Sequence, residues 1–116
     1  MSKYTYTFDQ LRDIDDNIYR CFANYARTIR DYGSVDQNRY FTADFGVISA
    51  FDEKEACEIL FKRYNTFPYP SGYYGRRMHV SDIITLWNEE TDPPEKSAWF
   101  CDSVGFVKLD GGGDYE

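Results

Sequence analysis

Apolar residues recur at spacings of three and four along the first third of the chain, from Thr7 to Tyr32. They are Phe8, Leu11, Ile14, Ile18, Phe22, Tyr25, Ile29 and Tyr32. Such spacing places the side chains on one face of an α-helix. Thr7 and Gln10 fit a capping box at its start, and Gly33 fits a C-terminal stop. The pattern therefore predicts a helix over residues 7–32.

A polar loop, residues 34–38, separates this helix from a shorter apolar stretch at residues 39–50. That stretch predicts one strand, or a bent pair of short strands interrupted at Gly46. Its apolar residues are Tyr40, Phe41, Phe45, Val47 and Ile48. Asp52 with Glu55 repeats the capping pattern, so we expect a second helix from there to about residue 64. Its expected buried face consists of Ala56, Ile59, Leu60 and Phe61.

The second half of the chain alternates loop and strand signals. Residues 66–75 carry two prolines and two glycines between aromatic side chains, which predicts an ordered loop. Three further strands are predicted by apolar runs at residues 79–88, 98–101 and 105–109. The glycines at the C-terminal end predict a flexible tail over residues 111–116.

The predicted order of elements is α-β-α-β-β-β, which is typical of the α+β class. We expect two helices packed on one side of a small antiparallel or mixed sheet. The chain has 116 residues, enough for one core but not for two. The sequence thus predicts a single domain over residues 1–110.

Composition and charge narrow the classes of partner. The chain has 11 Tyr, 9 Phe and 2 Trp, an excess that suits both a well-filled core and a recognition surface. Its net charge is −7, from 20 acidic and 13 basic residues in the whole chain, and the acidic residues are spread over both halves. This balance argues against direct, non-specific binding of nucleic acid and against anionic membranes. It favours solubility and a basic partner surface, such as a nucleic-acid-binding groove.

Cysteine usage and hydropathy indicate the compartment. The three cysteines, Cys21, Cys57 and Cys101, are too few and too widely spaced for a disulfide framework. The first seven residues lack the apolar core of a signal peptide, and no apolar run is long enough to span a membrane. We therefore expect a cytoplasmic protein.

No combination of side chains predicts catalysis or metal binding. The only histidine is His79, so a Cys–His pair would have to use it, and Cys57 and Cys101 fall in predicted buried elements. A Cys₃His zinc site from Cys21, Cys57, His79 and Cys101 would lack the close ligand pair that typical sites contain. We predict no enzyme, no cofactor and no metal, while leaving open whether these four residues converge.

Two groups of residues are candidate partner-binding sites. The acidic cluster of Asp13, Asp15 and Asp16 has the charge to imitate phosphates in a basic groove, although a solvated surface is the simpler interpretation. The loop combines aromatic and basic residues: Tyr69, Tyr73, Tyr74, Arg76 and Arg77. Such residues dominate protein interfaces and also stack on single-stranded bases. Because of the net charge we favour the protein interface, with a packed structural loop as the remaining alternative.

Several blocks in the second half resemble the YodL-like domain family. The matching blocks are Ile59–Asn65, Met78–Leu86 and Ala98–Phe106, over about residues 58–109. Departures from the family pattern are Tyr64 for a phenylalanine, His79 for a small residue and Val104 for an aromatic one. The matched Ser81, Asp82, Asp102 and Gly105 have the chemistry of turns and strand ends.

The resemblance implies a setting more than a mechanism, because no enzymatic activity defines this family and it is typical of bacterial mobile elements. Together with the acidic charge, it suggests a non-catalytic accessory factor of a mobile element or phage that binds a host protein. A host defence nuclease is the target we expect, which would make the chain an anti-restriction or anti-CRISPR inhibitor. The alternative is a nucleic-acid-binding module that uses the Tyr/Arg loop. Neither the partner nor the oligomeric state follows from the sequence.

Overall fold

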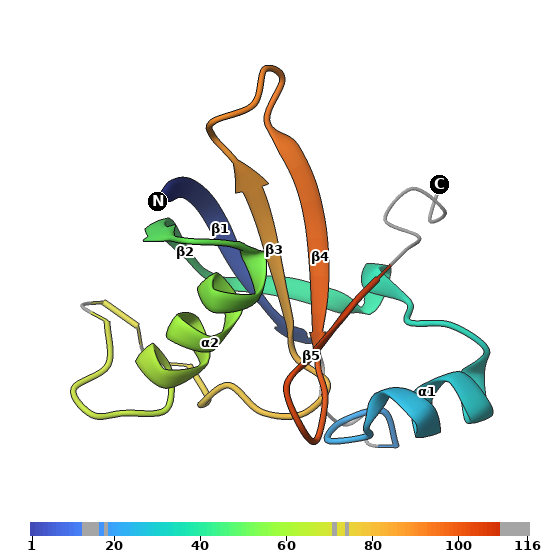
Figure 1. Ribbon diagram of the computed structural model, residues 1–116. Helices are drawn as coiled ribbons and strands as arrows, with labels where there is room; N and C mark the ends of the chain where they lie inside the picture. The colour runs from blue at the N-terminus through green and yellow to red at the C-terminus, as the bar shows by residue number, and fades with distance from the viewer. Residues whose placement is uncertain (13–16, 18, 71, 74, 110–116) are drawn as a thin grey trace.

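The structure, a computed structural model, describes residues 1–12, 17, 19–70, 72–73 and 75–109. Five strands and two helices make up the fold, with one short 3₁₀ turn at Gln37–Arg39 (Figure 1). The strands are β1 (Ser2–Leu11), β2 (Tyr40–Ala50), β3 (Ile83–Asn88), β4 (Glu95–Cys101) and β5 (Phe106–Lys108). The helices are α1 (Tyr25–Tyr32) and α2 (Glu53–Arg63). The α+β class is confirmed, but the order of elements is β-α-β-α-β-β-β.

All five strands form one antiparallel sheet in the order β2-β1-β3-β4-β5. The N-terminal strand β1 therefore lies inside the sheet, between β2 and β3, as Figure 1 shows. β2 and β5 form the two edges. A bulge at Ala43 interrupts the pairing of β2 with β1, because Phe8 pairs with Asp44 while Asp9 pairs with Thr42.

The predicted long helix over residues 7–32 is wrong. Its first part is strand β1, in which Tyr4, Tyr6, Phe8 and Gln10 are buried at every second position. Thr7 caps no helix, since its hydroxyl donates to Asp9 Oδ2 at 3.2 Å. Of the described residues in this stretch, only the last turns are helical, in α1.

The capping residues at the two ends of α1 explain why the helix is restricted to that segment. The Asn24 side chain caps its first turn by accepting from the Arg27 N–H. Gly33 ends it in the left-handed conformation with φ of 82°, as the sequence predicted. Phe22 lies before the helix with a positive φ of 68° and an exposed side chain. Ile14 and Ile18, also assigned to the predicted helix, lie outside the described residues.

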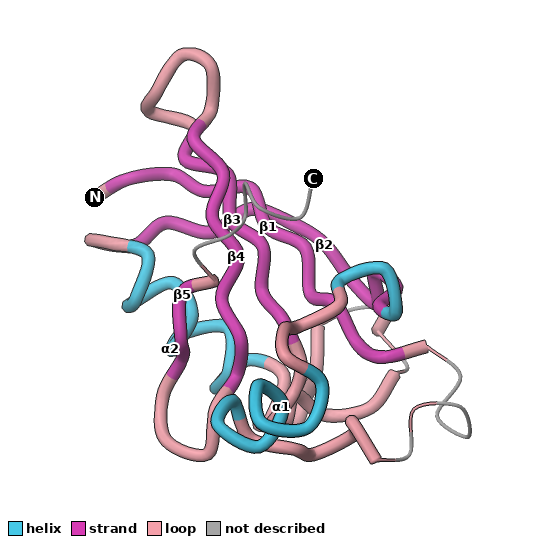
Figure 2. The backbone as a smooth tube through the Cα atoms, turned by 90° about the vertical axis from the view of Figure 1, so that its right-hand side faces the viewer, coloured by secondary structure: helices cyan, strands magenta, loops and turns pink. Residues whose placement is uncertain are grey.

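The larger core lies between α2 and one face of the sheet (Figure 2). Helix α2 begins at the predicted cap, where Asp52 accepts from the Glu55 N–H at 2.8 Å. Its buried side chains are Ala56, Cys57 and Leu60, followed by Tyr64 just past its end. They pack on Tyr6, Phe8, Ile48, Ile84 and Leu86. Phe61, predicted to be buried, is 41% exposed because it points about 100° around the helix from Leu60.

A smaller cluster covers the opposite face of the sheet. It contains Ile83, Ala98 and Phe100, whose neighbours Ile84, Trp99 and Cys101 belong to the larger core. Since alternate residues of a strand face opposite sides, the two clusters lie on different faces. Tyr25, the first residue of α1, packs here against Phe100 with ring centroids 5.6 Å apart. The helices thus contact opposite faces, and the expectation that both lie on one side is wrong.

The remaining elements follow the sequence with shifted ends. The strand at residues 40–50 and the last two strands are confirmed. The strand predicted from His79 begins only at Ile83, because residues 79–82 form a turn in which Ser81 has a positive φ of 84°. The predicted flexible tail, residues 111–116, lies outside the described residues. Among those described, no helix is long and apolar enough to cross a membrane.

Candidate protein interface

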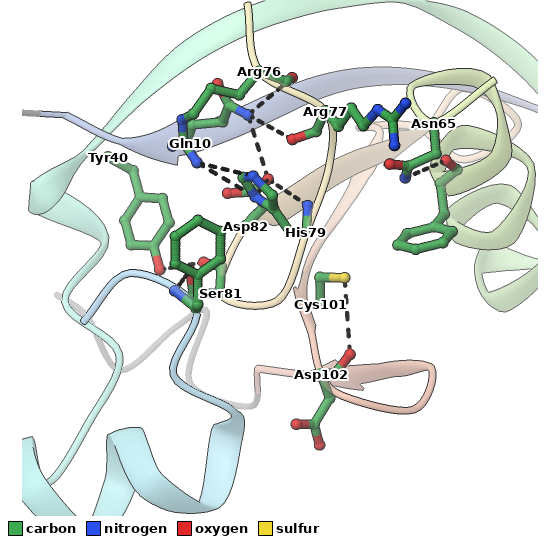
Figure 3. A network of polar contacts seen from close by, with 12 residues as sticks. Gln10, Tyr40, Asn65, Arg76, Arg77, His79, Ser81, Asp82, Cys101 and Asp102 are labelled. Carbon is green, nitrogen blue, oxygen red and sulfur yellow. Dashed lines mark hydrogen bonds and ion pairs between the residues drawn. The ribbon is translucent and has the colours of Figure 1, made fainter. Parts of the chain in front are cut away.

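A buried carboxylate holds the end of the Tyr/Arg loop against the sheet (Figure 3). Asp82 is 1% exposed, and its Oδ2 accepts from the His79 N–H at 2.9 Å. The same oxygen lies 3.4 Å from His79 Nδ1 and 3.4 Å from Gln10 Nε2. Gln10, on β1, also donates to the carbonyl oxygens of Arg76 and Arg77 at 3.3 Å. Asp82 and Gln10 therefore fix residues 76–82 to strand β1.

Ser81 joins this turn to three other segments. Its N–H donates to the carbonyl of Cys101 at 2.9 Å, and its own carbonyl accepts from the Tyr40 hydroxyl at 2.6 Å. Its hydroxyl oxygen accepts from the Phe22 N–H at 3.1 Å. Burial raises the pKa of the Tyr40 hydroxyl well above its usual range. Asp82 bonds a nearby backbone N–H before strand β3, as its chemistry predicted, whereas the Ser81 hydroxyl bonds the distant Phe22 N–H.

The turn between β4 and β5 has a similar role for α1. Asp102 Oδ1 accepts from the Tyr25 N–H at 3.0 Å and from the Ser103 N–H at 2.9 Å. The Asp102 N–H donates to the Gly105 carbonyl, and Gly105 has a φ of 71° that favours glycine. The predicted turn chemistry at Asp102 and Gly105 is confirmed, and it fixes the start of α1.

The Tyr/Arg loop, residues 69–77, contains both buried and surface side chains. Tyr73 is 8% exposed and packs on Phe8 and Tyr64, with ring centroids 5.8 and 5.0 Å away. Its hydroxyl donates to the Arg76 carbonyl, and burial raises the pKa of Tyr73 to about 12. Tyr73 is therefore packed in the core, and partner binding by this residue stays a prediction.

The other described members of the loop stay near the surface. The exposed Arg77 donates through Nε to the half-buried Tyr69 hydroxyl at 3.1 Å. Arg76 Nη1 lies 3.3 Å from His79 Nδ1. Tyr74 and the acidic cluster of Asp13, Asp15 and Asp16 lie outside the described residues. Partner binding by all of these residues stays a prediction.

The cysteines and the histidine do not form one group in the described part of the chain. Cys57 and Cys101 are buried in the larger core, where burial raises the pKa of Cys57 far above its usual range and that of Cys101 to about 12. His79 instead contacts Arg76, Asp82 and the Phe22 ring. Cys21 is half-buried beside Arg76 and Asp82, and burial raises its pKa as well. Among the residues that the structure describes, no group of metal-binding side chains has formed.

Sequence reasoning missed a surface beside α2 that is hollowed on two sides. One hollow, of about 350 Å³, is lined by Ile59, Lys62, Arg63, Thr66, Phe67 and Pro68. Phe67 is 83% exposed at its rim, and its ring contacts that of Tyr69 with centroids 5.9 Å apart. The predicted Tyr69 therefore contacts one lining residue of this hollow, and Arg77 is joined to it through the Tyr69 hydroxyl.

The second hollow, of about 300 Å³, lies between α2 and the β4–β5 turn. It is lined by Glu58, Phe61, Cys101, Asp102, Ser103, Gly105 and Phe106. The rings of Phe61 and Phe106 meet edge to face, 6.3 Å apart. The two hollows differ in charge, with Lys62 and Arg63 at the first and Glu58 and Asp102 at the second. A signal was present, since the matched block from Ala98 to Phe106 supplies five of the second hollow's residues.

The blocks that build this turn and hollow belong to a known family. The sequence model of the YodL-like domain family matches residues 5–111. The chain belongs to the YodL-like domain family. No curated protein and no solved structure matched it.

The match extends the YodL-like domain beyond the resemblance found in the sequence. Residues 58–109 were recognised, whereas the family covers β1, α1 and β2 as well. The structure gives the reason for one domain, because β1 pairs with β3 and Gln10 contacts Asp82. The polar residues shared in the recognised blocks connect strands, turns and α1 in this YodL-like domain.

Proposed function

We propose that this YodL-like domain is a non-catalytic protein-binding factor whose contact surface is the face of α2 between its two hollows. The observation that carries the proposal is this pair of hollows. Phe61 lines the second hollow, and its neighbour Lys62 lines the first. Concave sites with aromatic walls and a few charged groups are where proteins receive the anchor side chains of a partner.

The chemistry of the hollows describes the partner. The second hollow combines two aromatic rings with the carboxylates of Glu58 and Asp102, which suits an arginine or lysine side chain. The net charge of −7 adds a long-range attraction toward a basic surface. A protein with a basic nucleic-acid-binding groove has both properties.

We further propose that the partner is a host defence nuclease and that the domain is an anti-restriction or anti-CRISPR inhibitor of a mobile element or phage, acting in the cytoplasm. This finer proposal rests on the acidic charge and on the expected setting of the family. The alternative, a module that binds single-stranded nucleic acid, is weakened by the burial of Tyr73, which removes one of its stacking rings.

The proposal is tested by capture with matched variants. The double variant Phe61→Ser/Phe67→Ser removes the ring of each hollow, and we expect it to weaken partner binding by about 30-fold, as loss of an interface anchor does. Wild-type protein, immobilised, should retain a stoichiometric bacterial protein that the double variant does not, and the captured nuclease should cleave DNA only after release.

Phe45→Ser is the control, because Phe45 is 74% exposed but lies on β2, away from both hollows. It should bind the partner as the wild type does. Absence of any stoichiometric partner, together with no effect on restriction or CRISPR interference in cells, would contradict the proposal. A gel shift with single-stranded DNA at low salt, lost in Arg77→Ala, would favour the alternative.

A further inference from the structure

The two edges of the sheet differ in how well they are protected. Edge strand β5 has only three residues and ends in Lys108, and short, charged edges resist pairing with other chains. Edge strand β2 has 11 residues, Tyr40–Ala50, without a lysine, an arginine or a proline. Its single charge, Asp44, accepts from the buried Tyr64 hydroxyl at 2.6 Å. In the described part of the chain, β2 thus offers an open row of backbone groups.

Apolar side chains accompany that open edge. Phe45 is 74% exposed and Val47 is 54% exposed, and they flank Gly46 in the regular part of β2 beyond the bulge. Both point away from the core that contains Ile48 and Ala50. Large apolar residues on an unpaired edge mark a site for addition of another strand.

We infer that β2 pairs in antiparallel fashion with β2 of a second copy of this chain, about a two-fold axis at Gly46. An axis there places Phe45 opposite Val47 of the second copy and, by symmetry, Val47 opposite its Phe45. A two-fold interface requires this kind of self-complementary pattern. Both pairs lie on one face, where cross-strand aromatic and β-branched pairs stabilise a sheet.

Charge at the two ends of β2 supports the same arrangement. Arg39 precedes the strand, and the exposed Arg12 guanidinium donates to the Tyr40 carbonyl at 3.0 Å. Asp52 and Glu55 follow the strand, whereas the Glu53 carboxylate is bonded to Ser97 and Lys108 on β4 and β5. Antiparallel pairing brings the basic end of each copy beside the acidic end of the other, whereas parallel pairing would place like charges together. The edges are therefore complementary in charge as well as in side-chain pattern.

Association of the purified full chain tests this inference. Light scattering after gel filtration should give 13.7 kDa for one chain at micromolar concentration and approach twice that mass at millimolar concentration. Phe45→Lys places a charge on the edge and should hold the mass at that of one chain throughout. Phe67→Lys changes an equally exposed phenylalanine beside α2 and should leave the association unchanged.

Hydrogen exchange separates strand pairing from other modes of association. Alternate backbone amides of residues 44–48 should become protected as concentration rises in the wild type, but not in Phe45→Lys. A wild-type chain that remains a monomer at millimolar concentration would overturn the inference. So would a dimer that Phe45→Lys leaves intact, or one whose β2 amides still exchange freely, since its contact would then lie elsewhere. None of these three results would bear on partner binding at the α2 surface, which the Phe67 substitution tests.

Discussion

At the scale of single residues, polar side chains of the family blocks act mainly as connectors. Asp82 joins a turn to β1 and Asp102 joins another turn to α1. Their chemistry was predictable from the sequence, since Ser, Asp and Gly in such places bond backbone groups or form turns. Their partners were not predictable, because Gln10 and Tyr25 come from distant parts of the chain.

Asp82→Ala should lower the free energy of unfolding by about 3 kcal/mol, because it leaves the His79 N–H without its charged acceptor and removes one of the three acceptors of the Gln10 amide. Urea denaturation followed by circular dichroism measures this loss. Asp92→Ala is the matched control at an exposed aspartate, and it should change stability by less than about 0.5 kcal/mol. Equal effects of the two substitutions would show that Asp82 does not hold the turn.

The buried thiols predict a loss of stability in alkaline solution. Burial raises the pKa of Cys101 to about 12 and that of Cys57 further still. Unfolded thiols instead ionise at about pH 8.5. Above about pH 8.5 the unfolded chain binds fewer protons than the native one, so the free energy of unfolding falls as pH rises. The expected slope is about 1.4 kcal/mol per pH unit for each thiol.

Urea titrations between about pH 8 and about pH 9 measure this slope, below the range in which most unfolded tyrosines ionise. In Cys101→Ala the slope should fall by the share of one thiol, while Cys57 and the half-buried Cys21 still contribute. An unchanged slope would mean that the native Cys101 thiol ionises as readily as the unfolded one. The same experiment would then place Cys101 in contact with water through the neighbouring hollow.

At the scale of elements, spacing alone was ambiguous where a strand precedes a helix. Phe8 and Leu11 continue the helical spacing of Tyr25, Ile29 and Tyr32, although the first two belong to β1. The alternation Tyr4, Tyr6, Phe8 was the competing signal, together with the strand preference of tyrosine and threonine. Pairing with β2 and β3 decides between them, and those strands lie far along the chain.

Local capping located the end of α1 at Gly33 and the start of α2 at Asp52, although the capping box at Thr7 was wrong, and α2 offers a direct test. Asp52→Ala removes the acceptor for the Glu55 N–H at the first turn of α2. We expect a loss of about 1 kcal/mol in the free energy of unfolding, with the fold preserved. Asp52→Asn keeps an acceptor oxygen and should recover most of that loss in the same urea titration. A neutral Asp52→Ala would show that the core alone positions α2.

At the scale of the whole molecule, the sequence predicted the class, the second helix and four of the five strands, but not β1 or the layers. Those depend on which strand lies beside which. The same limit applies to the α2 surface, since Phe61 and Phe106 meet only after the sheet has formed. Tyr64, where the family usually has phenylalanine, is another case: its hydroxyl contacts Asp44 and Tyr6, which the sequence places far from it.

The interior position of β1 has a consequence for synthesis of the chain. β1 emerges from the ribosome well before its neighbour β3, which ends at Asn88. Until then β1 can pair with β2 but not with β3. One side of β1 therefore stays unpaired beside its tyrosines. The sheet is therefore completed late, and a nascent chain stalled before Asn88 should be prone to aggregation and sensitive to proteases.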